Sequence, residues 1–544
     1  MSACGGGCTL SPITSESIGS AAGNRTRFGD VDSEGAGVDY RVVSIVRDHA
    51  RGQGTAPAVT GDGRTVSYAE LDERSSRAAQ ALLAAGLGHG SRVAYVGKNA
   101  PEFFDLLFGA AKIGAVTAPV NWRLTPAEIA AIVADAGAPV TVLDAEFASL
   151  ASELPGRTVL TGDDHEAWLA AHPADDPGFT GEPGDIVVQL YTSGTTGVPK
   201  GVQLSNANFE VGERMARRWR LDGSAVSLVP MPLFHIGGSG WALAGLYAGC
   251  RQVLVRDIDP AALVDTFERE RITNAFIVPA VLQFMCQVPG AAGRDYSALR
   301  AITYGASPIT SEVLRRALDT FKAPLFQLYG MTETTGAIVQ LEPEDHDPEG
   351  PRAHLMRSAG RPYDWVEVKI VEPGGDAERP VGEVGEVLTR STQNTPGYWN
   401  RPEETGRLLA GGGWLRTGDA GHVDAEGYLF LTDRIKDMIV TGAENVYPIE
   451  VEEVLAAHPL IADVAVVGVP DERWGETVKA VVVLAPGAAL TEDEVIEYAR
   501  GRLAGFKRPR SVDFVDALPR NPSGKILKKD LRAPYWEGLG RTIA

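Results

Sequence analysis

The sequence has few cysteines and no long apolar run. Four cysteines occur among 544 residues: Cys4, Cys8, Cys250 and Cys286. A disulfide framework would need many more in a chain of this length, so a reducing cytoplasm is the expected location. A closed zinc site needs four ligands, and Cys4 and Cys8 supply two. No stretch approaches the ~20 apolar residues of a membrane span, and residues 1–7 do not read as a signal peptide. We therefore expect no integral membrane contact.

Positive charge is also scarce. Lysine and arginine together number 51 against 71 aspartates and glutamates, which gives a formal net charge of -20. A polyanion gains nothing from counterion release on DNA or RNA, so nucleic acid is not an expected partner. A local basic patch must therefore do any binding of phosphorylated ligands.

Residue patterning predicts three parts. Residues 1–38 are rich in Gly, Ser, Thr and Asp with few large apolar residues, which predicts a disordered tail. In residues 39–433, strand-like and helix-like segments alternate, which predicts a large α/β domain with mostly parallel sheets. Residues 434–544 predict a small α+β domain. The expected strands span residues 93–96, 186–191, 275–278, 301–304, 463–469, 479–484 and 511–515.

Capping residues mark the start of two predicted helices. Ser67 and Glu70 are spaced as a capping box, and the helix that follows ends at Gly86. Thr491 and Glu494 form a second box that opens a helix to about Leu503. One further helix is expected over residues 103–113.

A loop rich in glycine and hydroxyl groups follows the strand predicted at residues 186–191. Glycines let backbone N–H groups point into an anion-binding nest, hydroxyls add donors, and a lysine adds charge. The predicted phosphate-binding residues are Thr192, Ser193, Gly194, Thr195, Thr196, Gly197 and Lys200. Their spacing differs from the G-x-x-x-x-G-K-[ST] pattern of a Walker A loop. The loop therefore predicts a polyphosphate cradle of another class.

This loop resembles the phosphate-binding motif of the adenylate-forming superfamily, which includes acyl- and aryl-CoA synthetases, adenylation domains of peptide synthetases, and luciferases. The resemblance runs from Tyr40 to Trp536 and includes further motifs in the family's order. It implies that ATP, Mg²⁺ and coenzyme A take part. It also implies that residues 434–544 form a mobile lid that rotates between the two half-reactions.

The resemblance assigns roles to single residues. In the segment 328–335, Tyr329 would stack on adenine beside Gly330, Thr332 would contact the α-phosphate, and Glu333 would hold Mg²⁺. Asp419 and Arg434 would bind the ribose, Lys436 would be the hinge between domains, and Lys525 would be the catalytic lysine of adenylation. Gly305 and Ala306 would lie under the adenine. Lys528, Lys529 and Arg532 are expected to be surface charges.

By the same resemblance, two further regions would bind the acid substrate and the thiol arm of coenzyme A. His235, within a segment that resembles the lining of the acid pocket, would lie beside the substrate carboxylate. Gly442, Ala443 and Glu444 would line the pantetheine tunnel, with Ala443 where many relatives have glycine. Lys507, in the basic segment 506–509, would meet CoA phosphates or simply face solvent.

The resemblance implies an ATP-dependent acid–CoA ligase, with a medium- or long-chain fatty acid favoured as the substrate. An aryl-acid CoA ligase and a stand-alone enzyme that passes its acyl group to a carrier protein stay open as alternatives. Sequence motifs do not exclude a luciferase. An amino-acid adenylation domain is disfavoured, since His235 stands where that class needs an aspartate. A silent sensor is also disfavoured, because it need not keep Lys525. A homodimer is left open.

Overall fold

The computed structural model describes residues 41–192, 199–307, 309, 311–434, 437–441, 444–471, 473–520 and 526–537. The tail predicted at residues 1–38 lies outside these ranges. Within them, no helix has both the length and the apolar character that crossing a membrane requires.

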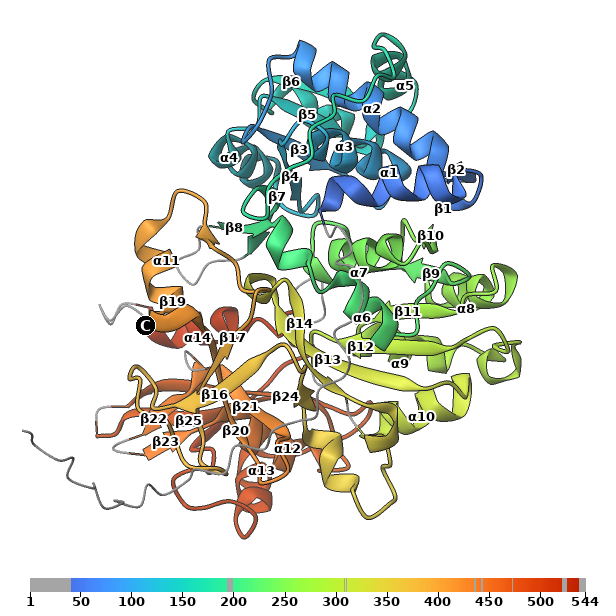
Figure 1. Cartoon of the computed structure of the whole chain (residues 1–544). Helices are drawn as coiled ribbons and strands as arrows, with labels where there is room; N and C mark the ends of the chain where they lie inside the picture. The colour runs from blue at the N-terminus through green and yellow to red at the C-terminus, as the bar shows by residue number, and fades with distance from the viewer. Residues whose placement is uncertain are drawn as a thin grey trace, which may run out of the picture. The chain divides into compact units, whose positions relative to one another are not determined.

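A seven-stranded sheet is formed mainly by the first part of the chain (Figure 1). Its order is β18 (Gly397–Tyr398), β8 (Lys200–Ser205), β7 (Ile186–Thr192), β4 (Val116–Val120), β3 (Arg92–Val96), β5 (Val140–Leu143) and β6 (Arg157–Leu160). The five strands from β7 to β6 are parallel, and β8 and β18 extend the sheet antiparallel at one edge. Alternate residues of β3 enter two different cores, so both faces of the sheet are covered.

A second sheet has nine strands. Its order is β15 (Arg361–Pro362), β14 (Gly336–Leu341), β13 (Leu325–Met331), β12 (Ala301–Gly305), β11 (Asn274–Ile277), β9 (Val226–Val229), β10 (Arg251–Leu254), β1 (Pro57–Gly61) and β2 (Arg64–Ser67). The six strands from β13 to β1 are parallel, and the outer strands are antiparallel. The predicted mostly parallel α/β class is therefore confirmed.

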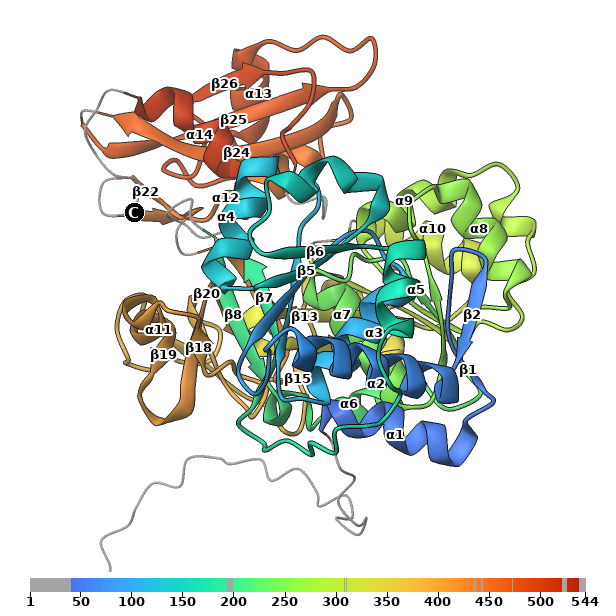
Figure 2. The same ribbon diagram turned by 90° about the horizontal axis from the view of Figure 1, so that it is seen from above.

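Helices connect and cover these two sheets (Figure 2). They are α1 (Val42–Gln53), α2 (Tyr68–Ala84), α3 (Pro101–Ala111), α4 (Pro126–Ala136), α5 (Asp163–Ala170), α6 (Gly212–Arg218), α7 (Ile236–Tyr247), α8 (Pro260–Arg269), α9 (Pro279–Gln287) and α10 (Ser311–Phe321). Helix α11 (Pro402–Leu408) instead packs beside β18 at the edge of the first sheet. The capping box predicted for α2 is only half formed. The Ser67 side chain accepts from the Glu70 backbone N–H, but the Glu70 carboxylate pairs with Arg64.

The third sheet was not predicted, and it is wholly antiparallel. It contains β16 (Glu367–Val371), β17 (Gly385–Arg390), β20 (Trp414–Val423) and β19 (Leu409–Ala410), with β21 (Leu429–Arg434) paired to β20. Strand β17 is buried at every position except its last, whereas β16 is buried only at its end.

The last part of the chain forms a small α+β unit. Its sheet contains β23 (Glu444–Val446), β22 (Ile439–Thr441), β25 (Gly475–Leu484) and β24 (Ile461–Asp471), with β26 (Ser511–Phe514) parallel to β25. Helices α12 (Pro448–Ala456) and α13 (Glu492–Ala499) share one apolar core with the sheet, and α14 (Lys528–Trp536) joins the other. The capping box of α13 is present, but the helix ends at Ala499 rather than Leu503.

Two residues of α14 differ from the prediction that they are surface charges. Arg532 is buried and bonds Asp437 at 2.6 Å, and Lys528 pairs with Glu452 at 2.9 Å. Both pairs tie α14 to its neighbours. The division of the chain at residues 433 and 434 stays a prediction.

Candidate active site

The phosphate loop is held at both ends by a β-hairpin. Strand β7 carries a run of apolar residues into the sheet and ends at Thr192, which lies opposite Lys200 at the start of β8. Both residues are half-buried. The predicted phosphate ligands Ser193, Gly194, Thr195, Thr196 and Gly197 lie outside the described residues. The hairpin therefore fixes where the loop begins and ends.

Side chains from distant segments hold this hairpin. The Tyr191 hydroxyl donates to Asp135 Oδ2 at 2.8 Å, and the Trp399 backbone N–H donates to the Gly201 carbonyl. The Lys200 ammonium lies 5.3 Å from the centre of the Tyr398 ring. Burial and the neighbouring Asp135 raise the pKa of Tyr191, so the hydroxyl keeps its proton and remains a donor.

The predicted metal ligand, Glu333, lies in a tight turn between β13 and β14. Gly330 allows that turn, because a Cβ there would come 1.8 Å from the Gly336 carbonyl oxygen. Glu333 is 6% exposed, and its carboxylate oxygen Oε1 accepts a hydrogen bond from the Tyr398 hydroxyl at 2.9 Å. Thr332, the predicted α-phosphate contact, is half-buried beside it. A buried carboxylate therefore lies near the strand that leaves the phosphate loop.

A second carboxylate meets the residue predicted to stack on adenine. The Tyr329 hydroxyl donates to Asp419 Oδ2 at 2.7 Å. Asp419 is 7% exposed on β20, and its backbone lies opposite that of Arg434 on β21. The hydrogen bond brings together two motifs that are 90 residues apart in sequence. The predicted adenine and ribose positions are therefore neighbours.

The loop after β12 lies beside the same strand. Gly305 is opposite Leu328 of β13, and a Cβ at Gly305 would come 2.3 Å from the Leu328 carbonyl oxygen. Ala306 follows with φ of 66°, a left-handed conformation that non-glycine residues seldom adopt. These two residues therefore lie at the carboxyl end of a parallel strand, where α/β sheets bind ligands.

His235 precedes α7 and is the predicted residue beside the acid. Its ring atom Nε2 is buried and has no hydrogen-bond partner among the described residues. Burial, assisted by the Arg123 cation, lowers the pKa of His235 to about 4, so the ring is neutral at physiological pH. The neighbouring Gly237 faces the Phe276 ring, 2.9 Å from where a Cβ would stand. The start of α7 therefore combines apolar residues with a neutral imidazole, and the Arg123 guanidinium lies 5.8 Å from the centre of the adjacent Phe234 ring.

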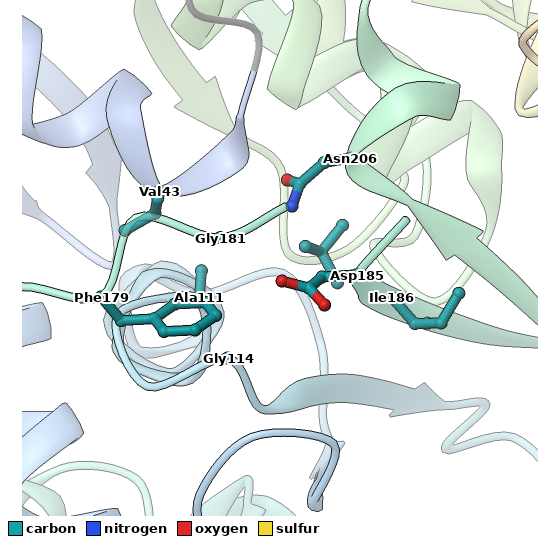
Figure 3. A pocket seen from close by; sticks show the side chains of 9 residues that line it. Val43, Ala111, Gly114, Phe179, Gly181, Asp185, Ile186 and Asn206 are labelled. Atoms are coloured by element: carbon teal, nitrogen blue, oxygen red, sulfur yellow. The ribbon is translucent and has the colours of Figure 1, made fainter. Parts of the chain in front are cut away.

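One cavity lies away from these residues. It lies between α1 and the start of β7 and is lined by Val43, Phe179, Asp185 and Asn206 (Figure 3). Its volume of about 10 Å³ is that of roughly one water molecule. The cavity is too small to hold the acid or the nucleotide.

Comparison with known proteins identifies the family. A family model described as "AMP-binding enzyme" matches residues 46–399, and one described as "AMP-binding enzyme C-terminal domain" matches residues 450–525. The chain belongs to the AMP-binding enzyme family. The predicted resemblance is thereby confirmed.

Relatives of this AMP-binding enzyme ligate different acids. The chain is 42% identical to the fatty acid–[acyl-carrier-protein] ligase ScoC of Streptomyces coeruleorubidus over 518 residues, 92% of the chain and 98% of ScoC. It is 38% identical to a feruloyl-CoA synthase of Amycolatopsis over 485 residues, 88% of the chain and 96% of the relative. ATP-bound MatB from Rhodopseudomonas palustris superposes with a TM-score of 0.84 at 29% identity, covering 93% of the chain and 100% of MatB. The chain is therefore an adenylate-forming acid ligase.

The residues predicted for CoA are only partly described in this AMP-binding enzyme. Lys507 Nζ lies 2.6 Å from Glu450 Oε2, so its charge is paired within the protein. Glu444 begins β23, while Gly442 and Ala443 lie outside the described residues, as do the predicted hinge Lys436 and the catalytic Lys525. The roles of all these residues stay predictions.

Sequence reasoning missed three residues that contact the predicted site. Tyr398 bonds Glu333, Asp135 bonds Tyr191, and Trp399 bonds the backbone of Gly201. The adjacent aromatics Tyr398 and Trp399 follow the dipeptide Pro396-Gly397, and this local pattern was the one available signal. Nothing in the sequence indicated which carboxylates they would meet.

Proposed function

We propose that this enzyme converts a fatty acid into its acyl-adenylate with ATP and then transfers the acyl group to the thiol of coenzyme A. The observation that carries the proposal is the hydrogen bond between Tyr329 and Asp419. A ring to stack on adenine and a carboxylate to accept from ribose hydroxyls are neighbours there, beside the carboxyl end of β12.

Mg²⁺ fits the donor set that the chain offers. The described residues contain no group of three His, Cys, Asp or Glu side chains that could hold a metal by themselves. Mg²⁺ in nucleotide enzymes is commonly held by one or two carboxylates together with substrate phosphates. Glu333 is such a carboxylate, and a bound Mg²⁺ would neutralise charge on the phosphates.

The first half-reaction joins the acid to AMP. A carboxylate oxygen of the acid attacks the α-phosphorus of ATP, and the bond from that phosphorus to pyrophosphate breaks. Negative charge builds on the phosphoryl oxygens, so donors and cations aimed there accelerate the step. We assign this work to Lys525, Thr332 and the phosphate loop, with Asp419 and Arg434 holding the ribose.

In the second half-reaction the thiol of CoA attacks the acyl carbon, the thiol proton leaves, and AMP departs. For this step the predicted lid would rotate about Lys436 and bring the tunnel residues Gly442, Ala443 and Glu444 to the site. His235, neutral above a pKa of about 4, offers a hydrogen bond beside the acid without competing as a counter-ion.

The substrate class is proposed from the start of α7. Ile236, Gly237 and Phe276 are apolar, which suits an alkyl chain. The similarity to a fatty acid ligase supports this choice. An aromatic acid is the second candidate, favoured by the similarity to feruloyl-CoA synthase.

A carrier protein is the second candidate for the acceptor. The pairing of Lys507 with Glu450 leaves that lysine less suited to a CoA phosphate, and ScoC is named for a carrier-protein reaction. Both acceptors offer a thiol for the same attack, so the chemistry of the site does not change with the choice.

Two assays test the proposal. Acid-dependent exchange of pyrophosphate into ATP, run with alkyl acids of increasing length and with hydroxycinnamic acids, identifies the acid. AMP release with the best acid is then compared with CoA and with a phosphopantetheinylated carrier protein. We expect alkyl acids and CoA to give the higher rates. Exchange with no acid in the panel would refute the proposed activity, and a preference for hydroxycinnamic acids would replace the fatty acid.

A further inference from the structure

One short segment joins the predicted metal ligand to the phosphate hairpin. Strand β18 pairs with β8, so that Tyr398 lies opposite Val202. The Thr395 backbone N–H donates to the Glu333 carbonyl at 2.8 Å. The segment 395–399 therefore contacts the turn that carries Glu333 and the strand that leaves the phosphate loop.

The side chain of Tyr398 makes the same connection. Its hydroxyl donates to Glu333 Oε1 at 2.9 Å, and the Lys200 ammonium lies 5.3 Å from the centre of its ring. A cation over an aromatic face is attracted by the ring quadrupole. One phenol thus contacts both the carboxylate and the lysine.

The residues that follow Tyr398 are also held by contacts with distant segments. The Trp399 indole N–H donates to the Asp135 carbonyl at 3.0 Å, and the Arg92 guanidinium lies 3.4 Å from the centre of the Trp399 ring. Arg401 pairs with the Asp135 carboxylate at 2.6 Å. These contacts after β18, together with the Thr395 contact before it, hold the backbone of Tyr398 from both sides.

We propose that Tyr398 is a positioning residue that orients the Glu333 carboxylate toward Mg²⁺–ATP and sets its distance from Lys200. This inference rests on the proposed function of Glu333 as the metal ligand. A hydroxyl donor is neutral, so it fixes the carboxylate without cancelling the charge that attracts the metal. Mg²⁺ demands near-ideal octahedral geometry, and hydrogen bonds to ligating carboxylates commonly change metal affinity or activity 10- to 100-fold.

The test compares Tyr398→Phe with Tyr428→Phe. Tyr428 is a matched control, because its hydroxyl also donates to a carboxylate, Asp345 Oδ2, at 2.9 Å, away from the predicted site residues. ATP affinity is measured by calorimetry in excess Mg²⁺ and in EDTA. We expect Tyr398→Phe to weaken ATP binding in Mg²⁺ about tenfold and to leave binding in EDTA unchanged. Tyr428→Phe should change neither.

A Mg²⁺ titration of pyrophosphate exchange gives a second readout. Tyr398→Phe should need about tenfold more Mg²⁺ for half-maximal rate, and the added metal should restore most of that rate. Introducing Tyr398→Phe into Glu333→Gln should add little, because the hydroxyl then has no charged ligand to orient. Equal losses in Mg²⁺ and EDTA, or additive effects of the two substitutions, would overturn the proposal. Wild-type enzyme without any exchange activity would instead refute the proposed function.

Discussion

Acid should destabilise this enzyme partly through one buried imidazole, His346. The ring is 7% exposed. Its Nδ1 lies 2.7 Å from the Glu342 carbonyl oxygen, which can only accept, so Nδ1 carries the proton. Nε2 lies 3.0 Å from the Tyr304 hydroxyl oxygen, which also lies 3.1 Å from Gln327 Oε1. Desolvation lowers the pKa of His346 to about 4 from the usual 6.5.

The sign and size of the effect follow from linkage. Between pH 6.5 and 4, the unfolded chain binds a proton at His346 and the native protein does not. The contribution of neutral His346 to the free energy of unfolding is therefore fully present above pH 6.5 and decreases as the pH drops below that value. With these two pKa values, the free energy of unfolding at pH 5 should be about 2 kcal/mol lower than at pH 8 on account of this one residue.

Urea denaturation followed by tryptophan fluorescence measures the effect in wild type, His346→Gln and His354→Gln. Glutamine does not titrate, so His346→Gln should lose about 2 kcal/mol less than wild type between pH 8 and pH 5. Other acid-sensitive groups are shared by both proteins and cancel in the comparison. His354 is exposed, and its substitution should leave the wild-type pH dependence intact. Equal losses in wild type and His346→Gln would refute the reasoning.

Three further substitutions test the site and the core. Asp419→Asn removes the charged acceptor of the Tyr329 hydroxyl and should weaken ATP binding about tenfold or more by calorimetry. Asp105→Asn removes the buried carboxylate that bonds Arg74 and His165, which leaves Arg74 paired with Glu166, and should lower the urea-derived unfolding free energy by about 3 kcal/mol. Lys525→Ala should slow adenylation a hundredfold or more, with thioester formation from supplied acyl-adenylate much less affected, when the two half-reactions are timed separately.

The local order of apolar and polar residues was enough to predict the strands that are buried on both faces of a sheet. The segments that became β7 and β12 were predicted within one or two residues, because strands buried on both faces are mostly apolar. The antiparallel sheet of β16, β17, β20 and β21 was missed. Polar residues such as Glu386, Thr389 and Arg416 interrupt its strands, so no continuous apolar run marks them. The strands also pair across intervening segments, which a local pattern does not reveal.

Individual site residues were easier to predict than the residues that they contact in the folded protein. Motif resemblance pointed to Tyr329 and Asp419 separately, but not to the hydrogen bond between them. The basic segment 506–509 left Lys507 either to meet CoA phosphates or to face solvent, and it did not indicate that Glu450 would pair with this lysine. Such contacts depend on which segments the fold brings together, and no local pattern encodes that. The predicted cytoplasmic location and homodimer stay predictions.

Two tyrosines make the same kind of contact at this site, because each hydroxyl donates a hydrogen bond to a buried carboxylate. Tyr329 donates to Asp419 at 2.7 Å, and Tyr398 donates to Glu333 at 2.9 Å. Each carboxylate is more than nine-tenths buried, so a hydrogen-bond donor beside it favours its charged form. A phenol supplies such a donor without adding a charge of its own, and it helps to fix the orientation of the carboxylate. A hydroxyl donor beside each carboxylate therefore suits the proposed pre-organised Mg²⁺–nucleotide site.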